Sequence, residues 1–231
     1  EIILSTLEHH ANIVPWQMLA QRSGAVIRVI SLDALGAIDF EHFLSLLSNK
    51  TKLVALSHAS NAIGSIQPIT EICAAAHRFG AKVLVDGAQA IAHLPLDVQT
   101  LGADFYVFSG HKIYAPTGIG VLWARSEILN AIPPWQGGGE MIATVSFSGS
   151  TYAAAPHRFE AGTPAIAQTV GLGAALTWLQ AQDRGAILQH ENQLRLSLEA
   201  GLAQIPGVKI HGQSLDKVAI TSMTFDFAHP F

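Results

Sequence analysis

The stretch Val83-Leu84-Val85-Asp86-Gly87-Ala88-Gln89 decides the fold class of this chain. Its apolar run has the length of a buried strand, and the acid that ends it is followed by a glycine turn. In α/β proteins, ligands bind at the carboxyl edge of a parallel sheet. The stretch therefore predicts a parallel strand with Asp86 at the ligand-binding edge. Asp86 could equally cap the next helix, so the stretch by itself leaves both interpretations open.

Similar apolar runs precede and follow that strand. Because they are rich in Val, Ile or Leu on both faces, they predict a mostly parallel sheet covered by helices, a three-layer α/β fold. The expected strands are Ile2–Thr6, Ala25–Ile30, Lys52–Ser57, Ala81–Asp86, Asp104–Phe108 and Gly118–Trp123. The expected helices are Ala11–Arg22, Asp39–Leu47, with Asp39 as its cap, and Ile69–Phe79, with Gly80 after it.

The composition changes after Gly118, and Pro133-Pro134 with Gly137-Gly138-Gly139 predict a loop-rich section to about Pro164. Beyond it we expect two helices separated at Gly185 and two strands: Ala165–Gln182, Ala186–Ala203, Val208–Ile210 and Val218–Phe227. Residues 1–182 are therefore expected to belong to a large domain, and residues 183–231 to begin a smaller one.

The composition indicates a globular protein, with 49% hydrophobic and 13% charged residues. The net charge of −4, without a Lys/Arg cluster, argues against nucleic-acid binding, and no apolar run has the length of a membrane span. The one cysteine, Cys73, is expected in the core, which fits a reducing compartment such as the cytoplasm. The start at Glu1 and the stop after a strand-like run suggest an internal fragment.

A second polar strand end lies in Phe105-Tyr106-Val107-Phe108-Ser109-Gly110-His111-Lys112. A lysine just beyond a buried strand can act as a nucleophile, although it could also be a surface lysine that extends from the sheet edge. Pyridoxal phosphate (PLP) chemistry needs such a lysine, an acid on the pyridine nitrogen, a group stacked on the ring and phosphate donors. Lys112 and Asp86 at successive strand ends match the first two needs.

Ser109-Gly110-His111-Lys112 and Asp86-Gly87-Ala88-Gln89 together resemble the class V aminotransferase family, and more closely its bacterial cysteine desulfurases of the SufS/CsdA type. The similar stretches also include Glu8–Trp16, Tyr114–Val121, Pro134–Met141 and Arg158–Pro164. The resemblance implies the fold type I of PLP-dependent transferases, with the start of a smaller C-terminal α+β domain. The N-terminal portion of the large domain is expected to be missing.

The same resemblance implies roles for single residues around PLP. Lys112 matches the Schiff-base lysine, and Asp86 matches the acid on the pyridine nitrogen. Gln89 and Asn61 match groups near the phenolic oxygen. His9 matches the imidazole that stacks on the ring and moves protons, so Lys112 and His9 are the expected catalytic residues. No metal site is expected.

Phosphate binding is implied for Ser109 and His111 of the same chain. Thr163 matches a phosphate contact delivered from a second subunit, which makes a homodimer the expected assembly. Two residues depart from the family pattern, since Ala115 and Ala165 replace a glycine and an asparagine. Neither departure affects an expected catalytic group.

The implied reaction converts L-cysteine to L-alanine and transfers the sulfur to an enzyme cysteine as a persulfide. The sulfur would then serve iron–sulfur cluster or other sulfur-cofactor assembly through an acceptor protein. That cysteine and a substrate-carboxylate arginine are expected after Phe231, and Cys73 does not match the former, so this chain alone is expected to be inactive. The alternatives are another class V enzyme (a lyase acting on L-selenocysteine, a kynureninase-like hydrolase or an epimerase) and a non-catalytic binding protein.

Overall fold

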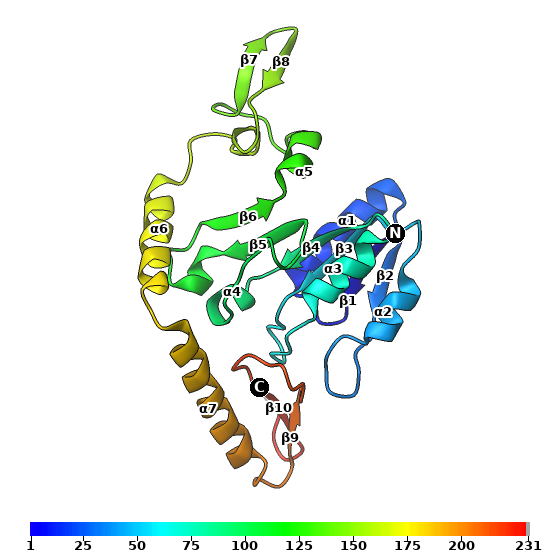
Figure 1. Ribbon diagram of the computed structural model, residues 1–231, viewed down its shortest axis with the longest axis vertical. Coiled ribbons are helices and arrows are strands. Elements are labelled where there is room, and N and C mark those ends of the chain that lie inside the picture. Colours follow the sequence, from blue (N-terminus) through cyan, green and yellow to red (C-terminus); the bar gives the residue numbers. More distant parts are fainter. Residues whose placement is uncertain (230–231) are drawn as a thin grey trace.

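A six-stranded sheet forms the centre of the computed structural model, which describes residues 1–229. In spatial order β2-β1-β3-β4-β5-β6, the strands are Ile27–Ile30, Ile2–Ser5, Leu53–Ser57, Lys82–Asp86, Phe105–Ser109 and Gly120–Ala124. The first five strands run parallel, and β6 runs antiparallel to β5 (Figure 1). The expected mostly parallel sheet is therefore confirmed.

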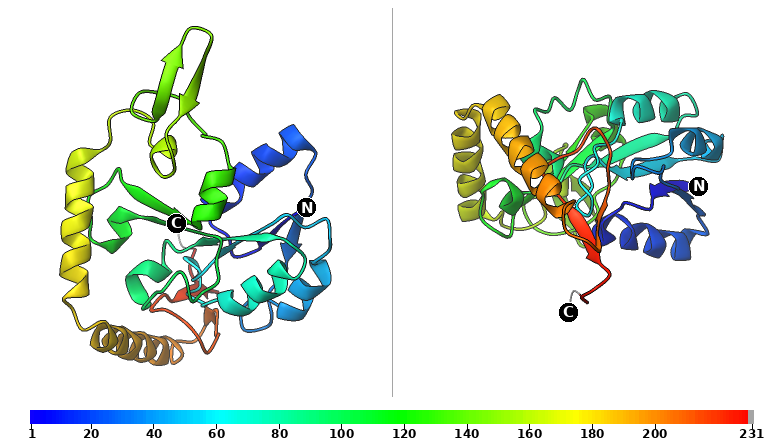
Figure 2. Two further views of the ribbon diagram at one scale, coloured as in Figure 1. Left: turned by 45° about the horizontal axis from the view of Figure 1, so that its top comes forward. Right: turned by 90° about the horizontal axis from the view of Figure 1, so that it is seen from below.

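Helices cover both faces of this sheet because its strands are apolar on both sides. On β1, Ile3 joins a core that includes Phe43 of α2 (Phe40–Leu46) and Ile72 of α3 (Ile69–His77). Its neighbours Ile2 and Leu4 face the other side of the sheet, where Trp16 of α1 (Val14–Ser23) packs against them. Figure 2 shows α1 on one side of the sheet and α2 with α3 on the other. These are the three layers that the sequence predicts.

Two expected helix signals are present. Asp39 accepts a hydrogen bond of 3.0 Å from the His42 N–H at the start of α2, and Gly80 adopts a φ of 71° after α3. The lone thiol, Cys73 of α3, is buried as expected, and burial together with the Asp104 charge raises its pKa to about 12.

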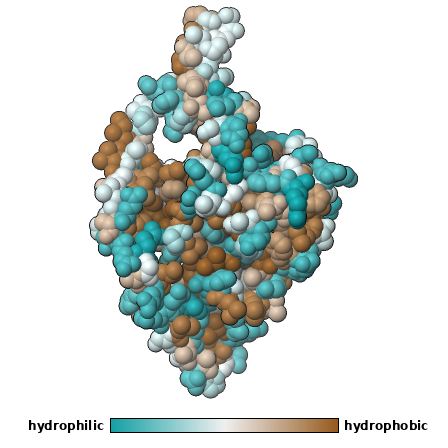
Figure 3. Space-filling model, viewed as in Figure 1, coloured by the Kyte–Doolittle hydropathy of each residue, from teal (hydrophilic) through white to brown (hydrophobic). Residues whose placement is uncertain are grey.

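The helix α6 (Ile166–Gln180) flanks the other end of the sheet. Its Leu172 and Leu179 pack on Ile113, which lies in the 3-10 helix η2 (Gly110–Ile113) that follows β5. Other α6 side chains are exposed, and Figure 3 shows apolar residues gathered along this side of the molecule. Among residues 1–229, no helix has the length and apolarity to cross a membrane.

The section expected to be loop-rich contains more structure than predicted. A hairpin of β7 (Ile142–Ser146) and β8 (Gly149–Tyr152) projects from the body (Figure 1), and α5 (Ser126–Ala131) precedes it. The loop expectation is therefore wrong over the hairpin. Nearly all hairpin side chains are exposed. Polar and apolar residues do alternate from Thr144 to Ser148, but the prolines and the triple glycine before them favour a loop.

The chain continues into α7 (Arg184–Leu202), which the Asp183 carboxylate caps by accepting the Ala186 N–H at 2.9 Å. The helix break lies before Asp183, so the predicted interruption at Gly185 is wrong, because Gly185 is in the first turn of α7. The domain boundary between residues 182 and 183 stays a prediction.

The last two strands, β9 (Val208–His211) and β10 (Ser222–Phe225), form an antiparallel pair. The strand expected over 218–227 is shorter because its first residues have other partners. The Val218 N–H donates to the Gly64 carbonyl at 2.9 Å, and the Ile66 N–H donates to the Asp216 carbonyl at 2.9 Å. This segment therefore packs on the turn after β3.

Candidate functional site

A cavity of about 440 Å³ opens at the carboxyl ends of β3, β4 and β5. Its wall contains all but one of the site residues predicted from the sequence: His9, Asn61, Asp86, Gln89, Ser109, His111 and Lys112. These residues come from four separate segments of the chain, so the fold brings together what the sequence keeps apart. The cavity lies at the edge of the sheet where α/β proteins bind ligands.

Asp86 is the last residue of β4, and the turn behind it determines its position. A Cβ atom on Gly87 would overlap the ring of Tyr106, so only glycine fits at this turn. The Asp86 Oδ1 atom accepts the Ala88 N–H at 2.9 Å, and the N-cap of the next helix is Gln89 instead. The helix-capping interpretation of Asp86 is therefore wrong.

The groups behind Asp86 carry no charge. His58 is buried, and burial lowers its pKa to about 4, which keeps the ring neutral. The His58 Nδ1 atom lies 3.3 Å from the Tyr106 hydroxyl, whose pKa is raised by burial and then by the negative charge of Asp86. Within residues 1–229, the Asp86 carboxylate accepts a hydrogen bond from one N–H group and from no cationic side chain. It therefore has lone pairs left for a ligand.

Lys112 lies in the short η2 helix that continues β5. Its neighbour Ile113 is buried, and the Gly110 N–H donates to the Ile119 carbonyl at 2.9 Å, which closes the turn tightly. The Lys112 side chain is partly buried in the cavity wall rather than extended over the surface. No ion pair within residues 1–229 involves its amine.

The remaining predicted residues line the other walls of the cavity. His9 precedes the 3-10 helix η1 (His10–Asn12), and its Nδ1 atom accepts the Ala11 N–H at 3.1 Å. Asn61 lies in a turn that buried Ser60 supports by accepting two backbone N–H groups at 3.2 Å. These bonds fix the backbone on which each side chain stands.

Thr163 does not line the cavity. It is exposed in the loop that precedes α6. A contact from Thr163 to a group in this cavity would require a second subunit, which remains the prediction made from the resemblance.

Three further cavity residues with polar side-chain atoms were not predicted from the sequence: Asn12, Trp16 and Ser57. The Trp16 Nε1–H donates to the Asn12 Oδ1 atom at 2.9 Å, so these two side chains form one wall. Ser57 is the last residue of β3, and the rule that singled out Asp86 and Ser109 at strand ends would have found it. Asn12 and Trp16 carry no comparable local signal.

The donor set fits PLP as the sequence predicts. Lys112 offers an amine and Asp86 an open carboxylate, and the side chains of Ser109 and His111 make no hydrogen bond within residues 1–229. Four such groups around one cavity match the lysine, the acid and the phosphate donors that PLP requires. The described residues contain no group of three or more His, Cys, Asp or Glu side chains arranged for a metal ion.

A family model described as Aminotransferase class-V matches residues 1–231. A curated cysteine desulfurase of Enterobacter sp. strain 638 is 52% identical over 220 residues, which cover 95% of this chain and 54% of that protein. A second, from Synechococcus elongatus, is 49% identical over 230 residues, or 100% of this chain and 37% of that protein. The chain thus spans about half the length, or less, of these curated relatives.

Solved structures show the same likeness. The cysteine desulfurase CsdA of Escherichia coli superimposes with a TM-score of 0.95 at 42% identity, over 99% of this chain and 57% of that one. An apo cysteine desulfurase of Thermococcus onnurineus superimposes with a TM-score of 0.93 at 35% identity, over 100% of this chain and 58% of that one. A C-DES mutant with glycine covalently linked to its PLP cofactor gives 0.86 at 34% identity, over 97% and 61%.

Proposed function

Because the chain belongs to the class-V aminotransferase family, we propose that the whole protein is a PLP-dependent cysteine desulfurase. It converts L-cysteine to L-alanine and transfers the sulfur to one of its own cysteines as a persulfide. One observation carries the proposal. A cavity with an open carboxylate and an unpaired lysine lies in a chain that is half identical to curated cysteine desulfurases.

The residues around the cavity divide the work between them. Lys112 would hold the cofactor, Asp86 would keep a proton on its ring nitrogen, and Ser109 and His111 would bind its phosphate. Bound PLP supplies an electron sink for the reaction. The Lys112 amine and the His9 imidazole are the groups that would move protons at the substrate.

Two amides complete the proposed contacts with the cofactor. Gln89 and Asn61 line the same cavity, and their side chains supply donors suited to the ring oxygen. Both side chains stand on the carboxyl edge of the sheet, after β4 and β3 respectively.

We place the sulfur-accepting cysteine outside these 231 residues. Cys73 is unsuited to the role because it is buried on α3 and its pKa is raised to about 12. A thiol attacks as its thiolate, so such a group is a poor nucleophile near neutral pH. This chain alone would therefore not complete the sulfur transfer.

The assembly of the whole protein is part of the proposal. A homodimer would bring Thr163 of each copy to the phosphate in the other. Ile166, Val170 and Trp178 are exposed on α6, the helix that begins shortly after Thr163, and would be covered by such an interface. We also propose that the sulfur passes to an acceptor protein for iron–sulfur cluster assembly and that the protein is cytoplasmic. The proposed domains are residues 1–182 and the segment that begins at residue 183.

The test uses Lys112→Ala in the full-length protein. We expect it to abolish the absorption band of lysine-bound PLP and to lower alanine and sulfide release from L-cysteine by at least about 100-fold. Lys82→Ala is the matched control, because Lys82 lies at the opposite edge of the sheet. Normal turnover by Lys112→Ala would refute the proposal.

A comparison of substrates separates the alternatives. If the unchanged protein binds PLP but releases selenide from L-selenocysteine and no sulfide from L-cysteine, it is a selenocysteine lyase and the desulfurase proposal is wrong. Failure to take up PLP would favour the binding protein.

A further inference from the structure

Glu8 is a buried acid beside the cavity for which the proposed reaction has no use. Only 7% of its surface is exposed, and it does not line the cavity, although His9 follows it directly. A buried carboxylate is unfavourable unless it is well hydrogen-bonded. Its partners therefore indicate what it does.

The Glu8 carboxylate accepts hydrogen bonds from three side chains on three different elements. The Ser5 hydroxyl at the end of β1 donates to Oε1 at 2.5 Å. The Asn12 amide of η1 donates to Oε2 at 2.7 Å, and the Ser57 hydroxyl at the end of β3 donates to the same oxygen at 2.8 Å. Glu8 thus joins the His9–η1 segment to two strands of the sheet.

Two of these three partners form the cavity wall. Asn12 is fixed at both ends of its amide, because its oxygen accepts the Trp16 indole N–H at 2.9 Å while its nitrogen binds Glu8. Ser57 is paired in register with Asp86 across β3 and β4. The position of η1, and with it that of His9, is therefore linked to the strand that carries Asp86.

The negative charge of Glu8 is disfavoured by burial and has no cation beside it in the described part of the chain. Burial raises the pKa of Glu8, and the bonds from Ser5, Asn12 and Ser57 only oppose this effect. Within residues 1–229, no cation forms an ion pair with this carboxylate. What the site uses is a pair of acceptor oxygens at the correct distance.

We propose that Glu8 is a positioning residue, whose hydrogen bonds to Asn12 and Ser57 hold His9 and the adjoining wall in place around the cofactor cavity. The role rests on the proposed function, because it concerns the same site. Glu8 itself touches neither substrate nor cofactor. It acts through the side chains that it binds.

Two substitutions separate length from charge. Glu8→Gln keeps the length: its oxygen can accept from Asn12 and Ser57, and its NH₂ can donate to the Ser5 hydroxyl, which also accepts. Glu8→Asp keeps the charge but withdraws both oxygens by one methylene. Both are made in the full-length PLP-bound protein, and thermal unfolding checks that each variant folds.

Three quantities are measured: the rate of PLP release, the absorption band of the lysine-bound cofactor, and kcat with KM for L-cysteine. For Glu8→Asp we expect a shifted band, faster PLP release and a kcat lower by about 100-fold with a smaller change in KM, since misplaced catalytic groups lose rate. For Glu8→Gln we expect an unshifted absorption band. The PLP release rate, kcat and KM should stay within about fivefold of those of the unchanged protein.

The opposite order, or an unaffected Glu8→Asp variant, would overturn the proposal. If Glu8→Asp does not fold, Ser57→Ala removes the same link from the cavity end and is expected to speed PLP release; an unchanged rate there would be equally decisive against it. If the unchanged protein binds PLP but does not release sulfur, the proposed function fails. The PLP release rates then still decide the role of Glu8.

Discussion

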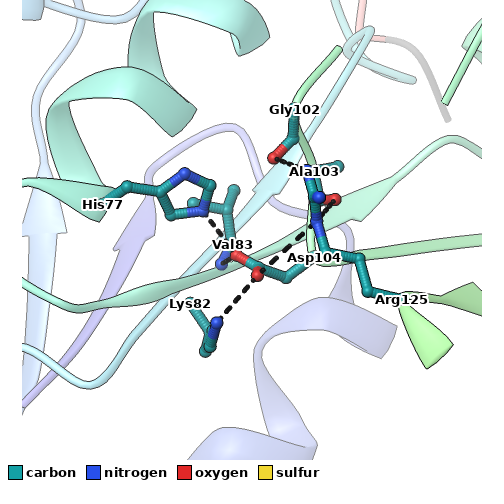
Figure 4. A network of polar contacts seen from close by, with 7 residues as sticks. All are labelled: His77, Lys82, Val83, Gly102, Ala103, Asp104 and Arg125. Atoms are coloured by element: carbon teal, nitrogen blue, oxygen red, sulfur yellow. Dashed lines mark hydrogen bonds and ion pairs between the residues drawn. The ribbon is translucent and has the colours of Figure 1, made fainter. Parts of the chain in front are cut away.

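Two aspartates at opposite edges of the same sheet have opposite surroundings. Asp104, at the amino edge, is buried and accepts hydrogen bonds from the His77 ring at 2.7 Å, the Lys82 amine at 3.1 Å and the Val83 N–H at 2.8 Å (Figure 4). Asp86, at the carboxyl edge, receives one N–H from the described part of the chain. Both are acids at strand ends, yet only one is satisfied by its own protein.

The difference distinguishes an acid whose hydrogen bonds are satisfied within the fold from an acid that is open to a ligand. A buried polar group normally finds its partners within the protein, and Asp104 does so with the His77 ring, the Lys82 amine and a backbone N–H. Arg125 adds positive charge 4.0 Å from the same carboxylate. Asp86 is left open beside a cavity, which is the arrangement expected of a group that binds something else.

The largest expected effect separates the two aspartates by activity. Asp86→Asn in the full-length protein is expected to lower kcat for L-cysteine by about 100- to 1,000-fold, because an amide cannot hold the cofactor's ring proton as a carboxylate does. The absorption spectrum of bound PLP should change, while the thermal unfolding temperature should not fall. A near-normal kcat in this variant would show that Asp86 is not needed for the reaction.

The second effect is on stability. Asp104→Asn is expected to lower the free energy of unfolding by about 2–3 kcal/mol, because His77 and Lys82 lose their anionic acceptor. Urea denaturation measures the loss, and PLP binding is the control that should remain. A stable Asp104→Asn variant without PLP binding would reverse the roles assigned to the two edges.

The third effect is the pH dependence of that stability. Burial raises the pKa of Asp104, but the hydrogen bonds from His77, Val83 and Lys82 outweigh it and hold the pKa below its ordinary value. A carboxyl whose folded-state pKa is depressed stabilises the fold above its unfolded pKa, about 4, and loses this contribution as the pH falls further.

The difference in unfolding free energy between the unchanged protein and Asp104→Asn should therefore shrink as the pH is lowered from about 5 to about 3. Urea titrations at each pH give the two curves. A difference that grows on acidification would show that Asp104 is not stabilised as a carboxylate.

The smallest effect concerns one exposed partner of Asp104. Lys82 is 52% exposed, and ion pairs in contact with water contribute little. Lys82→Ala is therefore expected to lower the free energy of unfolding by less than about 1 kcal/mol, with unchanged turnover of L-cysteine. A loss as large as that of Asp104→Asn would place the strength of the cluster in Lys82 rather than in the buried acid.

Much of the fold could be predicted because the strands are continuous apolar runs. The apolar run that ends at Asp86 forms β4, and the run that ends before Ser109 forms most of β5. Because Lys112 follows the second run directly, its place at the end of β5 could also be predicted. The hairpin β7–β8 was missed because the prolines and the triple glycine before it favour a loop, although Thr144–Ser148 alternates polar and apolar residues.

The supporting contacts of the site could not be predicted for a different reason. Glu8 binds Ser57, 49 residues away, and neither residue carries a local sign of the other. Asp104 resembles Asp86 in sequence, as an acid beside an apolar strand, and only the three donors around it show that it is satisfied. Pairings between distant segments depend on the completed fold.

The packing of residues 216–222 on the turn that carries Asn61 affects the order in which the site is built during synthesis. The Ser222 hydroxyl donates to the Ala62 carbonyl, 160 residues earlier in the chain. A ribosome that adds about 5–20 residues per second reaches Ser222 roughly 8–30 s after Ala62. The segments that carry Asp86 and Lys112 leave the ribosome before the segment that packs on this turn. The turn that carries Asn61 therefore lacks this contact until one of the last described segments of the chain has been synthesised.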